Sequence, residues 1–99
     1  MPEDIQVKFY RYLKDLSVQG LESARQFKAF IKSKDADERK SASINMIACK
    51  AGAKKILANV TRELCLTFVT PFDREDIQNL AAELYKIPKT IDKAREHLE

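Results

Sequence analysis

The sequence contains few of the residues that interrupt regular secondary structure: its 99 residues include two glycines, three prolines and no tryptophan. Proteins built from short strands and tight turns use glycine and proline often, so this composition argues against a β-rich fold. Charged residues make up 33% and hydrophobic residues 44%, as is typical of long amphipathic helices. We therefore expect an all-α protein with a single domain over residues 1–99, a length that supports one hydrophobic core.

Residues that form disulfides or bind zinc are also scarce. The chain has one histidine, His97, and two cysteines, Cys49 and Cys65, with no Cys-x-x-Cys motif. On one helix the two cysteines would lie about 24 Å apart, which is too far for a disulfide. The sequence therefore predicts neither a zinc site nor a disulfide framework, and it favours a reducing compartment.

No apolar run approaches the roughly 20 residues that span a bilayer, and no signal-peptide pattern opens the chain. We accordingly expect a cytoplasmic protein. The net charge of +3 is too small to predict nucleic-acid binding by itself. Acidic residues are absent between Arg39 and Arg62, however, and that window contains four lysines. A local basic surface is therefore predicted.

Apolar residues recur at alternating spacings of three and four in three segments, which predicts helices over residues 5–33, 36–69 and 74–98. The expected buried stripe of the first segment is Phe9, Leu13, Leu16, Gly20, Ala24, Phe27 and Ile31. The second stripe is Met46, Cys49, Ala53, Leu57, Val60, Leu64 and Phe68. The third is Ile77, Leu80, Leu84, Ile87, Ile91, Ala94 and Leu98. The expected fold is an antiparallel three-helix bundle.

Four residues add detail to the predicted helices: they indicate a helix contact, an N-terminal cap and a kink. Gly20 interrupts the first stripe without a side chain, which indicates close approach by another helix. Asp35 and Glu38 have the spacing of a reciprocal N-terminal cap for the second helix. Pro88 cannot donate a backbone hydrogen bond, so it should kink or break the third helix near Ile87.

The stretch TPFDREDI, residues 70–77, can be interpreted as a carboxylate site or as the start of a helix. In the second interpretation Asp73 is the N-cap, Asp76 is at N3, and Phe72 packs on Ile77. We favour this interpretation, because acidic residues in a first turn also suit the helix dipole. No histidine or glycine-rich loop accompanies these acids, so no catalytic residues are predicted and the protein is not expected to be an enzyme.

The run LTFVTPFDREDIQNLAAEL, with the long amphipathic helix before it, resembles the PhoU-like proteins, specifically the phosphate transport regulators that accompany Pit-type phosphate transporters. The resemblance implies a non-enzymatic regulator or accessory protein at the cytoplasmic side of a phosphate transporter, cytoplasmic or peripheral at the inner face of the membrane. It also implies that this chain corresponds to the first of two three-helix repeats. The second repeat would then be absent, cut away or supplied by another copy, so a homo-oligomer is expected.

In that family each repeat binds iron or zinc through a Glu-x-x-x-Asp motif in helix two and an Asp-Asp-x-x-Asp motif in helix three. Aligned on Thr70, the first motif falls on Lys50 and Lys54. The second falls on Tyr85, Lys86 and Lys89. Lysine ammonium groups offer no lone pair to a metal at neutral pH. No metal or other cofactor is therefore expected.

The replaced positions form two pairs of lysines about one helical turn apart, Lys50 with Lys54 and Lys86 with Lys89. If the two pairs face the same region, they form a basic patch that could bind phosphate, another anion or an acidic partner. The alternative is that these lysines lay their stems along the core edge and keep their ammonium groups in water.

Two other functions remain open: a self-associating structural bundle and a nucleic-acid-binding helical module. The second is disfavoured because Phe9, Phe27, Phe30 and Phe68 are spaced as core residues and not as a stacking platform.

Overall fold

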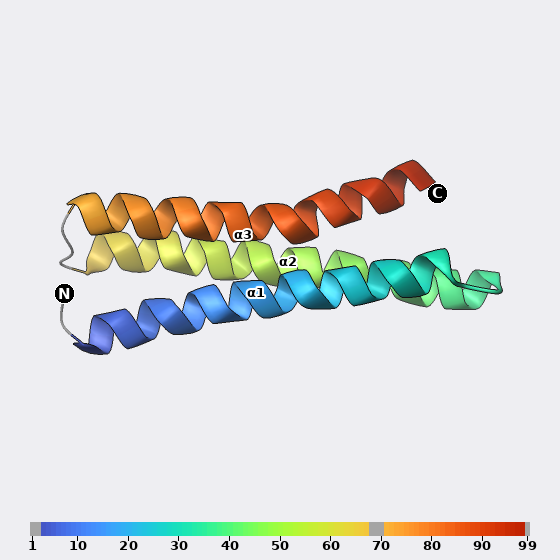
Figure 1. The fold of residues 1–99 in the computed structure, drawn as a ribbon, viewed down its shortest axis with the longest axis horizontal. Coiled ribbons are helices and arrows are strands. Elements are labelled where there is room, and N and C mark those ends of the chain that lie inside the picture. The colour runs from blue at the N-terminus through green and yellow to red at the C-terminus, as the bar shows by residue number, and fades with distance from the viewer. Residues whose placement is uncertain (1–2, 68–70, 99) are drawn as a thin grey trace.

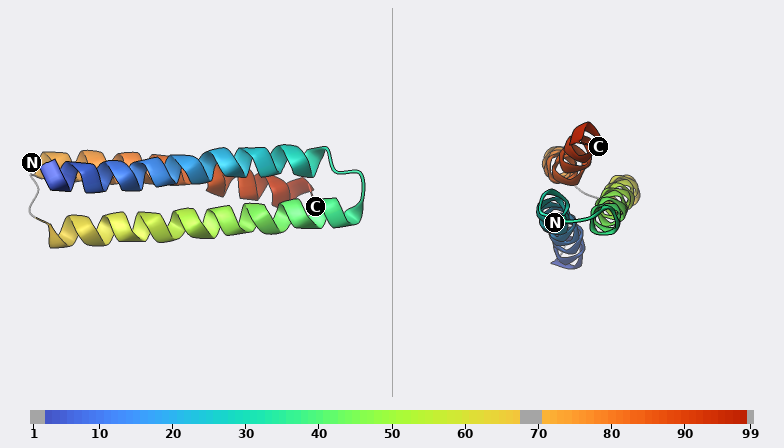
Figure 2. Two further views of the ribbon diagram at one scale, coloured as in Figure 1. Left: turned by 90° about the horizontal axis from the view of Figure 1, so that it is seen from below. Right: turned by 90° about the vertical axis from the view of Figure 1, so that its right-hand side faces the viewer.

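The computed structural model describes residues 3–67 and 71–98, which form three long helices (Figure 1). They are α1 (Glu3–Ile31), α2 (Ala36–Leu66) and α3 (Pro71–Leu98). Each helix packs on the other two in a bundle 51 × 21 × 15 Å in extent. α2 runs antiparallel to both neighbours, so α1 and α3 run in the same direction (Figure 2). The predicted all-α three-helix bundle is confirmed. None of the described helices is long and apolar enough to cross a membrane.

The junction between α1 and α2 is fixed by local hydrogen bonds. α1 ends two residues before the predicted end, where the Ser33 hydroxyl donates to the Phe30 carbonyl at 2.7 Å. Asp35 is the N-cap of α2, and its carboxylate accepts from the Glu38 amide at 2.9 Å, as predicted. The returning bond differs from a capping box, because the Glu38 carboxylate accepts from the amide of Lys34 and not from that of Asp35.

α3 begins earlier than predicted. Its first helical residue is Pro71, so Asp73 lies inside the first turn and the predicted N-cap at Asp73 is wrong. Proline suits this first position because its missing N–H would have no partner within the helix. Asp73 still lies near the positive end of the helix dipole. The side chain of Phe72, and the Phe68 position, lie outside the described residues.

The core consists of two clusters along the bundle. The larger cluster joins all three helices through Phe9, Leu16, Ala53, Val60, Leu64 and Ala81. The smaller one contains Phe30, Ala42 and Met46, with Phe27 and Ile91 packed against them. The predicted buried stripe of α2 is confirmed within the described residues, where its members are buried or half-buried.

Gly20 marks the close crossing of α1 and α3. α1 continues through it, Gly20 is buried, and a Cβ added there would lie 3.2 Å from Ile87 Cγ2. Few real Cβ contacts are that short, so the two helices approach closely because residue 20 has no side chain. The predicted close approach by another helix is confirmed.

α3 continues past Pro88 and changes direction in its C-terminal half (Figure 1), where Asp92 and Arg95 are still buried. Pro88 has no N–H to donate to the Leu84 carbonyl, which accounts for a bend at this position. Of the second half of the predicted α1 stripe, Phe27 is half-buried and packs on the smaller cluster, as predicted. Ala24 and Ile31 are exposed, so their prediction as buried residues is wrong, and the preceding residues Ser23 and Phe30 are buried instead.

The predicted stripe of α3 is also displaced. Leu80, Ile87 and Leu98 are about half exposed. The buried positions are Ala81, Pro88, Asp92 and Arg95. The other predicted members, Ile77, Leu84, Ile91 and Ala94, are half-buried, and the first three pack on the core clusters. The predicted stripe is therefore correct in part, and a proline and an ion pair occupy buried positions that the hydrophobic pattern does not select.

Alanine substitutions at the two glycines provide a matched test of the crossing. Alanine is favoured over glycine by up to about 1 kcal/mol inside a helix. At Gly52 the added methyl group meets only the Gln19 side chain, at 3.5 Å, so Gly52→Ala should raise the free energy of unfolding. In Gly20→Ala, crowding between the added methyl group and Ile87 offsets the gain in helix propensity. The larger side chain in Gly20→Leu crowds Ile87 further and should lower the free energy of unfolding by about 1–3 kcal/mol.

Urea unfolding measures all three variants, and Ile87→Ala should restore part of the loss in Gly20→Leu. Equal stabilisation by alanine at both glycines, with no loss from Gly20→Leu, would contradict a close crossing.

Candidate binding surface

The outer face of α2 is cationic and partly apolar. Its exposed residues recur every three or four positions: Lys40, Ile44, Ile47, Ala51, Lys54, Ala58 and Arg62. We call this set the α2 outer face. Ile44 and Ile47 are 54% and 48% exposed, although neither position is needed for the core. Because α2 has no acidic residue between Arg39 and Arg62, Lys54 has no acidic residue within two turns on its own helix, whereas exposed Asp37 lies one turn before Lys40.

A shallow groove of about 370 Å³ adjoins this face, between α2 and the C-terminal half of α3. α2 contributes Ile47, Lys50, Ala51 and Lys54 to it, and α3 contributes Asp92, Arg95 and Glu96. The α3 residues that line the groove all follow Pro88. Two of the four candidate lysines, Lys50 and Lys54, therefore line one surface.

Lys50 is paired with a buried carboxylate. Its Nζ donates to Asp92 Oδ2 at 3.3 Å, and Arg95 Nε donates to the other oxygen, Oδ1, at 2.9 Å. The side chains of Asp92 and Arg95 are only 4% and 8% exposed, whereas that of Lys50 is 37% exposed. An anion that enters the groove must compete with Asp92 for Lys50, which leaves exposed Lys54 as the more available cation.

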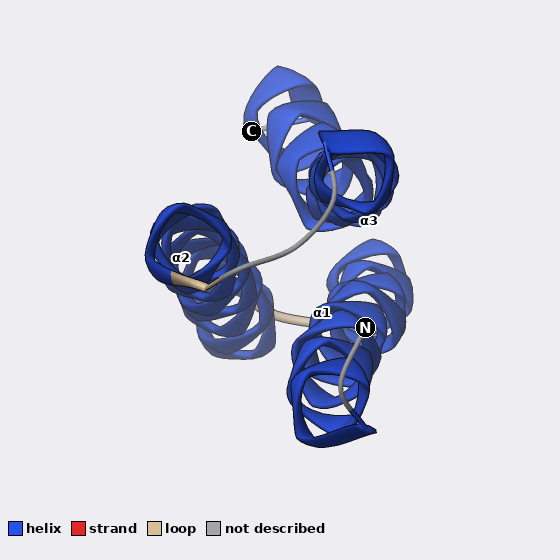
Figure 3. Cartoon of the chain, turned by 90° about the vertical axis from the view of Figure 1, so that its left-hand side faces the viewer, coloured by secondary structure: helices blue, strands red, loops and turns tan. Residues whose placement is uncertain are grey.

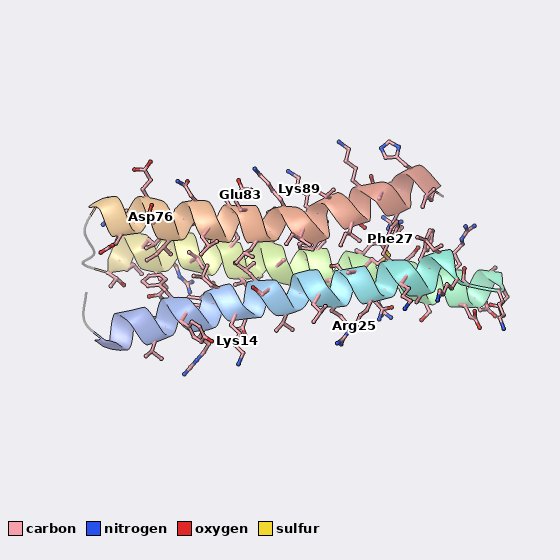
Figure 4. All side chains as sticks on the ribbon, viewed as in Figure 1. Lys14, Arg25, Phe27, Asp76, Glu83 and Lys89 are labelled. Atoms are coloured by element: carbon pink, nitrogen blue, oxygen red, sulfur yellow. The ribbon has the colours of Figure 1, made fainter. Side chains whose placement is uncertain are left out.

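The other two candidate lysines lie elsewhere. Lys86 Nζ is 2.9 Å from Glu83 on its own helix, and both side chains are largely exposed. Lys86 lines a different groove, with Ile87, Thr90 and Ile91. Lys89 is exposed and projects from the side of α3 away from the other helices (Figure 4). The structure thus brings Lys50 and Lys54 together but does not join them with Lys86 and Lys89 in one groove.

The aromatic residues and the histidine that the sequence analysis discusses lie outside this groove. Tyr85 is half-buried against the larger core cluster, and Phe9 and Phe30 are buried. His97 is exposed near the end of α3. Within the described part of the chain, no group of three or more histidine, cysteine or acidic side chains is arranged to hold a metal ion.

Both cysteines are free. Burial raises the pKa of the Cys49 thiol, and the neighbouring Ser23 hydroxyl partly opposes this shift. The Ser23 hydroxyl is itself fully buried and forms no well-aligned hydrogen bond with another described group. Cys49 is therefore a protonated residue at the α1–α2 contact, and Cys65 is exposed.

The buried Asp92–Arg95 pair was missed in the sequence analysis. The hydrophobic pattern selects only apolar residues at helical spacing, so it does not select Asp92 or Arg95. The available signal was the spacing of an acid and an arginine three residues apart, which allows a pair on one helix face. That spacing is common on exposed surfaces and does not by itself indicate burial.

No known protein family, curated protein or solved structure matches this chain. The resemblance to the PhoU-like proteins therefore stays a hypothesis that depends on the TPFDREDI stretch and the helical pattern around it.

Removing the charge of Asp92 tests the buried network. Asp92→Asn keeps the side-chain shape but removes the carboxylate charge that pairs with the buried guanidinium of Arg95. It should lower the free energy of unfolding by about 3 kcal/mol. Glu83→Gln is the control, because it breaks an exposed pair of the same spacing and should change that value by less than about 0.5 kcal/mol. Denaturant unfolding of both variants measures the difference, and equal small effects would contradict a structural role for Asp92.

Proposed function

We propose that this chain is a non-enzymatic accessory protein that binds an acidic partner through the α2 outer face and the adjoining groove. The resemblance identifies a phosphate transporter, contacted at its cytoplasmic side, as the partner to test. The observation that supports the proposal is the exposure of Ile44 and Ile47 between Lys40 and Lys54, in a stretch of α2 that has no acidic residue.

The combination of apolar and cationic side chains is suited to a protein partner. Exposed apolar side chains provide area that becomes favourable when it is buried, at roughly 25 cal/mol per Å². The surrounding lysines and arginine increase the association rate with an acidic surface and disfavour basic partners.

Nucleic acid is the second class of acidic partner. It also fits a helix face with several cations and no acids. The buried positions of Phe9 and Phe30 leave these rings unable to stack on bases, so an acidic protein surface is the better match.

Crosslinked capture of the tagged protein from the membranes and cytosol of its source cells tests the proposal. We expect the wild type to recover a phosphate transporter, and Lys54→Glu with Lys55→Glu to reduce that recovery at least tenfold. Lys50 is left unchanged, because a glutamate there would face the buried Asp92 carboxylate.

The matched control is Lys86→Glu with Lys89→Glu, which changes the net charge equally on α3 and should retain the transporter. Recovery of nucleoprotein alone, released by moderate salt, would replace the protein partner with nucleic acid. Equal recovery with both double variants would contradict binding through the α2 outer face.

The groove also permits a direct test of anion binding. Because Asp92 occupies Lys50 and Arg95, we expect inorganic phosphate to bind the wild type only in the millimolar range. Asp92→Asn should bind phosphate severalfold more tightly, and Lys54→Glu should abolish the binding, whereas Lys89→Glu should not. Calorimetric titration at low salt measures these values under conditions where circular dichroism shows each variant to be folded. Unchanged binding in both Asp92→Asn and Lys54→Glu would rule out this groove as the anion site.

A further inference from the structure

The exposed apolar residues of the α2 outer face follow a seven-residue repeat. Ile44, Ala51 and Ala58 are spaced by seven, and Ile47 lies between the first two. We call these four residues the outer seam. Such spacing keeps side chains on one side of a helix and is the spacing with which one helix packs along another. The outer seam extends over about 21 Å, or roughly four turns, which suits a helical segment lying along α2.

The outer seam has large side chains at one end and small ones at the other. Ile44 and Ile47 are about half exposed. Ala51 and Ala58 are also exposed, and their methyl groups let a second backbone approach α2 closely. A helix that packs evenly on this seam therefore places small residues beside the isoleucines and large apolar residues beside the alanines. The groove beside Ile47 and Ala51 provides room for such large side chains.

Cations flank the outer seam on both sides. Successive residues of a helix point about 100° apart, so Lys54 and Lys55 lie on opposite sides of the line through Ala51 and Ala58. Both lysines are exposed. Within the part of the chain that the structure describes, neither of them forms an ion pair. A helix lying on the seam would therefore be attracted if it had a carboxylate on each of its two flanks.

The acidic side chains around this face leave its centre cationic. Asp37 lies more than four turns before Lys54. Glu63 accepts from Lys8 of α1 at 2.7 Å, and the buried carboxylate of the groove is paired within the chain. Exposed Glu96 lines the α3 side of the groove and reduces the attraction for an acidic helix there.

We propose that the outer seam binds an acidic amphipathic helix of the partner, which lies along α2 with its apolar side on the seam and carboxylates beside Lys54 and Lys55. This inference rests on the proposed function and narrows the partner from an acidic surface to one helix of about four turns. Figure 3 shows α1 and α3 on one side of the bundle and α2 on the other, so none of the described helices covers the outward side of α2. A second copy of the seam is disfavoured because its lysines would repel those of the first.

Binding of a designed peptide to the full chain tests the proposal. The probe is a synthetic peptide of about three heptads with leucine at positions a and d and glutamate at positions e and g. We expect a micromolar dissociation constant at low salt, measured by fluorescence anisotropy, and a gain of helix content on binding, measured by circular dichroism. A second peptide has proline at one central outward position. It keeps the charge but cannot form a continuous helix, so it should bind at least tenfold more weakly.

Variants of the chain test the position of the helix. Ala51→Trp prevents close approach and should raise the dissociation constant of the heptad peptide at least tenfold, whereas Ala24→Trp, at an exposed alanine of α1, should not change it. Lys55→Glu should raise it severalfold, and Lys14→Glu, the same charge change on α1, should not. Glu96→Gln should lower it. All five positions are exposed, so the variants should fold, as circular dichroism and urea unfolding will show.

Equal affinity for the two peptides, no binding of the heptad peptide, or equal effects of Ala51→Trp and Ala24→Trp would overturn the helical partner. The proposed function fails separately, because it depends on capture from cells. Capture that is lost with Lys54→Glu and Lys55→Glu, together with equal affinity for the two peptides, would indicate an acidic partner of another shape. Peptide binding with the expected pattern, together with capture of no transporter, would support the helix and reject the transporter.

Discussion

The contact between Gly20 on α1 and Ile87 on α3 determines how the three helices lie. A glycine lets the two helices approach until the Ile87 side chain rests on the α1 backbone. The next residue, Pro88, cannot continue the hydrogen-bond ladder, and α3 changes direction there. Before the crossing all three helices share the larger core, whereas after it α3 contributes Ile91 to a smaller cluster around Phe30. The crossing thus lies between the two core clusters.

The charged network lies beyond the crossing. The C-terminal half of α3 brings Asp92 against Lys50 of α2, and Arg95 fills a buried position on the same helix. A buried carboxylate is costly to desolvate, and this cost is reduced when two cations donate to its two oxygens. The same arrangement changes the interpretation of the lysine pattern. Of the two lysines that line the groove, one neutralises a carboxylate of its own chain, and the available positive charge lies on the exposed α2 outer face.

The sequence was sufficient to predict the number of helices, their order and most of the contacts of α2, because α2 packs on both neighbours and its apolar residues follow one stripe. It was also sufficient for Gly20, where the missing side chain in an apolar stripe has one plausible structural cause. It was not sufficient for the stripes of α1 and α3 near Pro88. The burial of these residues depends on the direction of α3 beyond Pro88. The spacing of apolar residues along one helix carries no information about that direction. For the same reason the relation between Lys50 and Lys86 could not be predicted: the two lysine pairs were assumed to face one region, and the orientation of α3 separates them.

The α2 outer face combines apolar and cationic side chains. Ile44 and Ile47 are exposed between Lys40 and Lys54, in a stretch of α2 that has no acidic residue. An acidic partner would be attracted to this stretch, whereas a basic partner would be repelled. The sign of the charge thus selects the class of partner, and the exposed apolar side chains provide area that becomes favourable when it is buried.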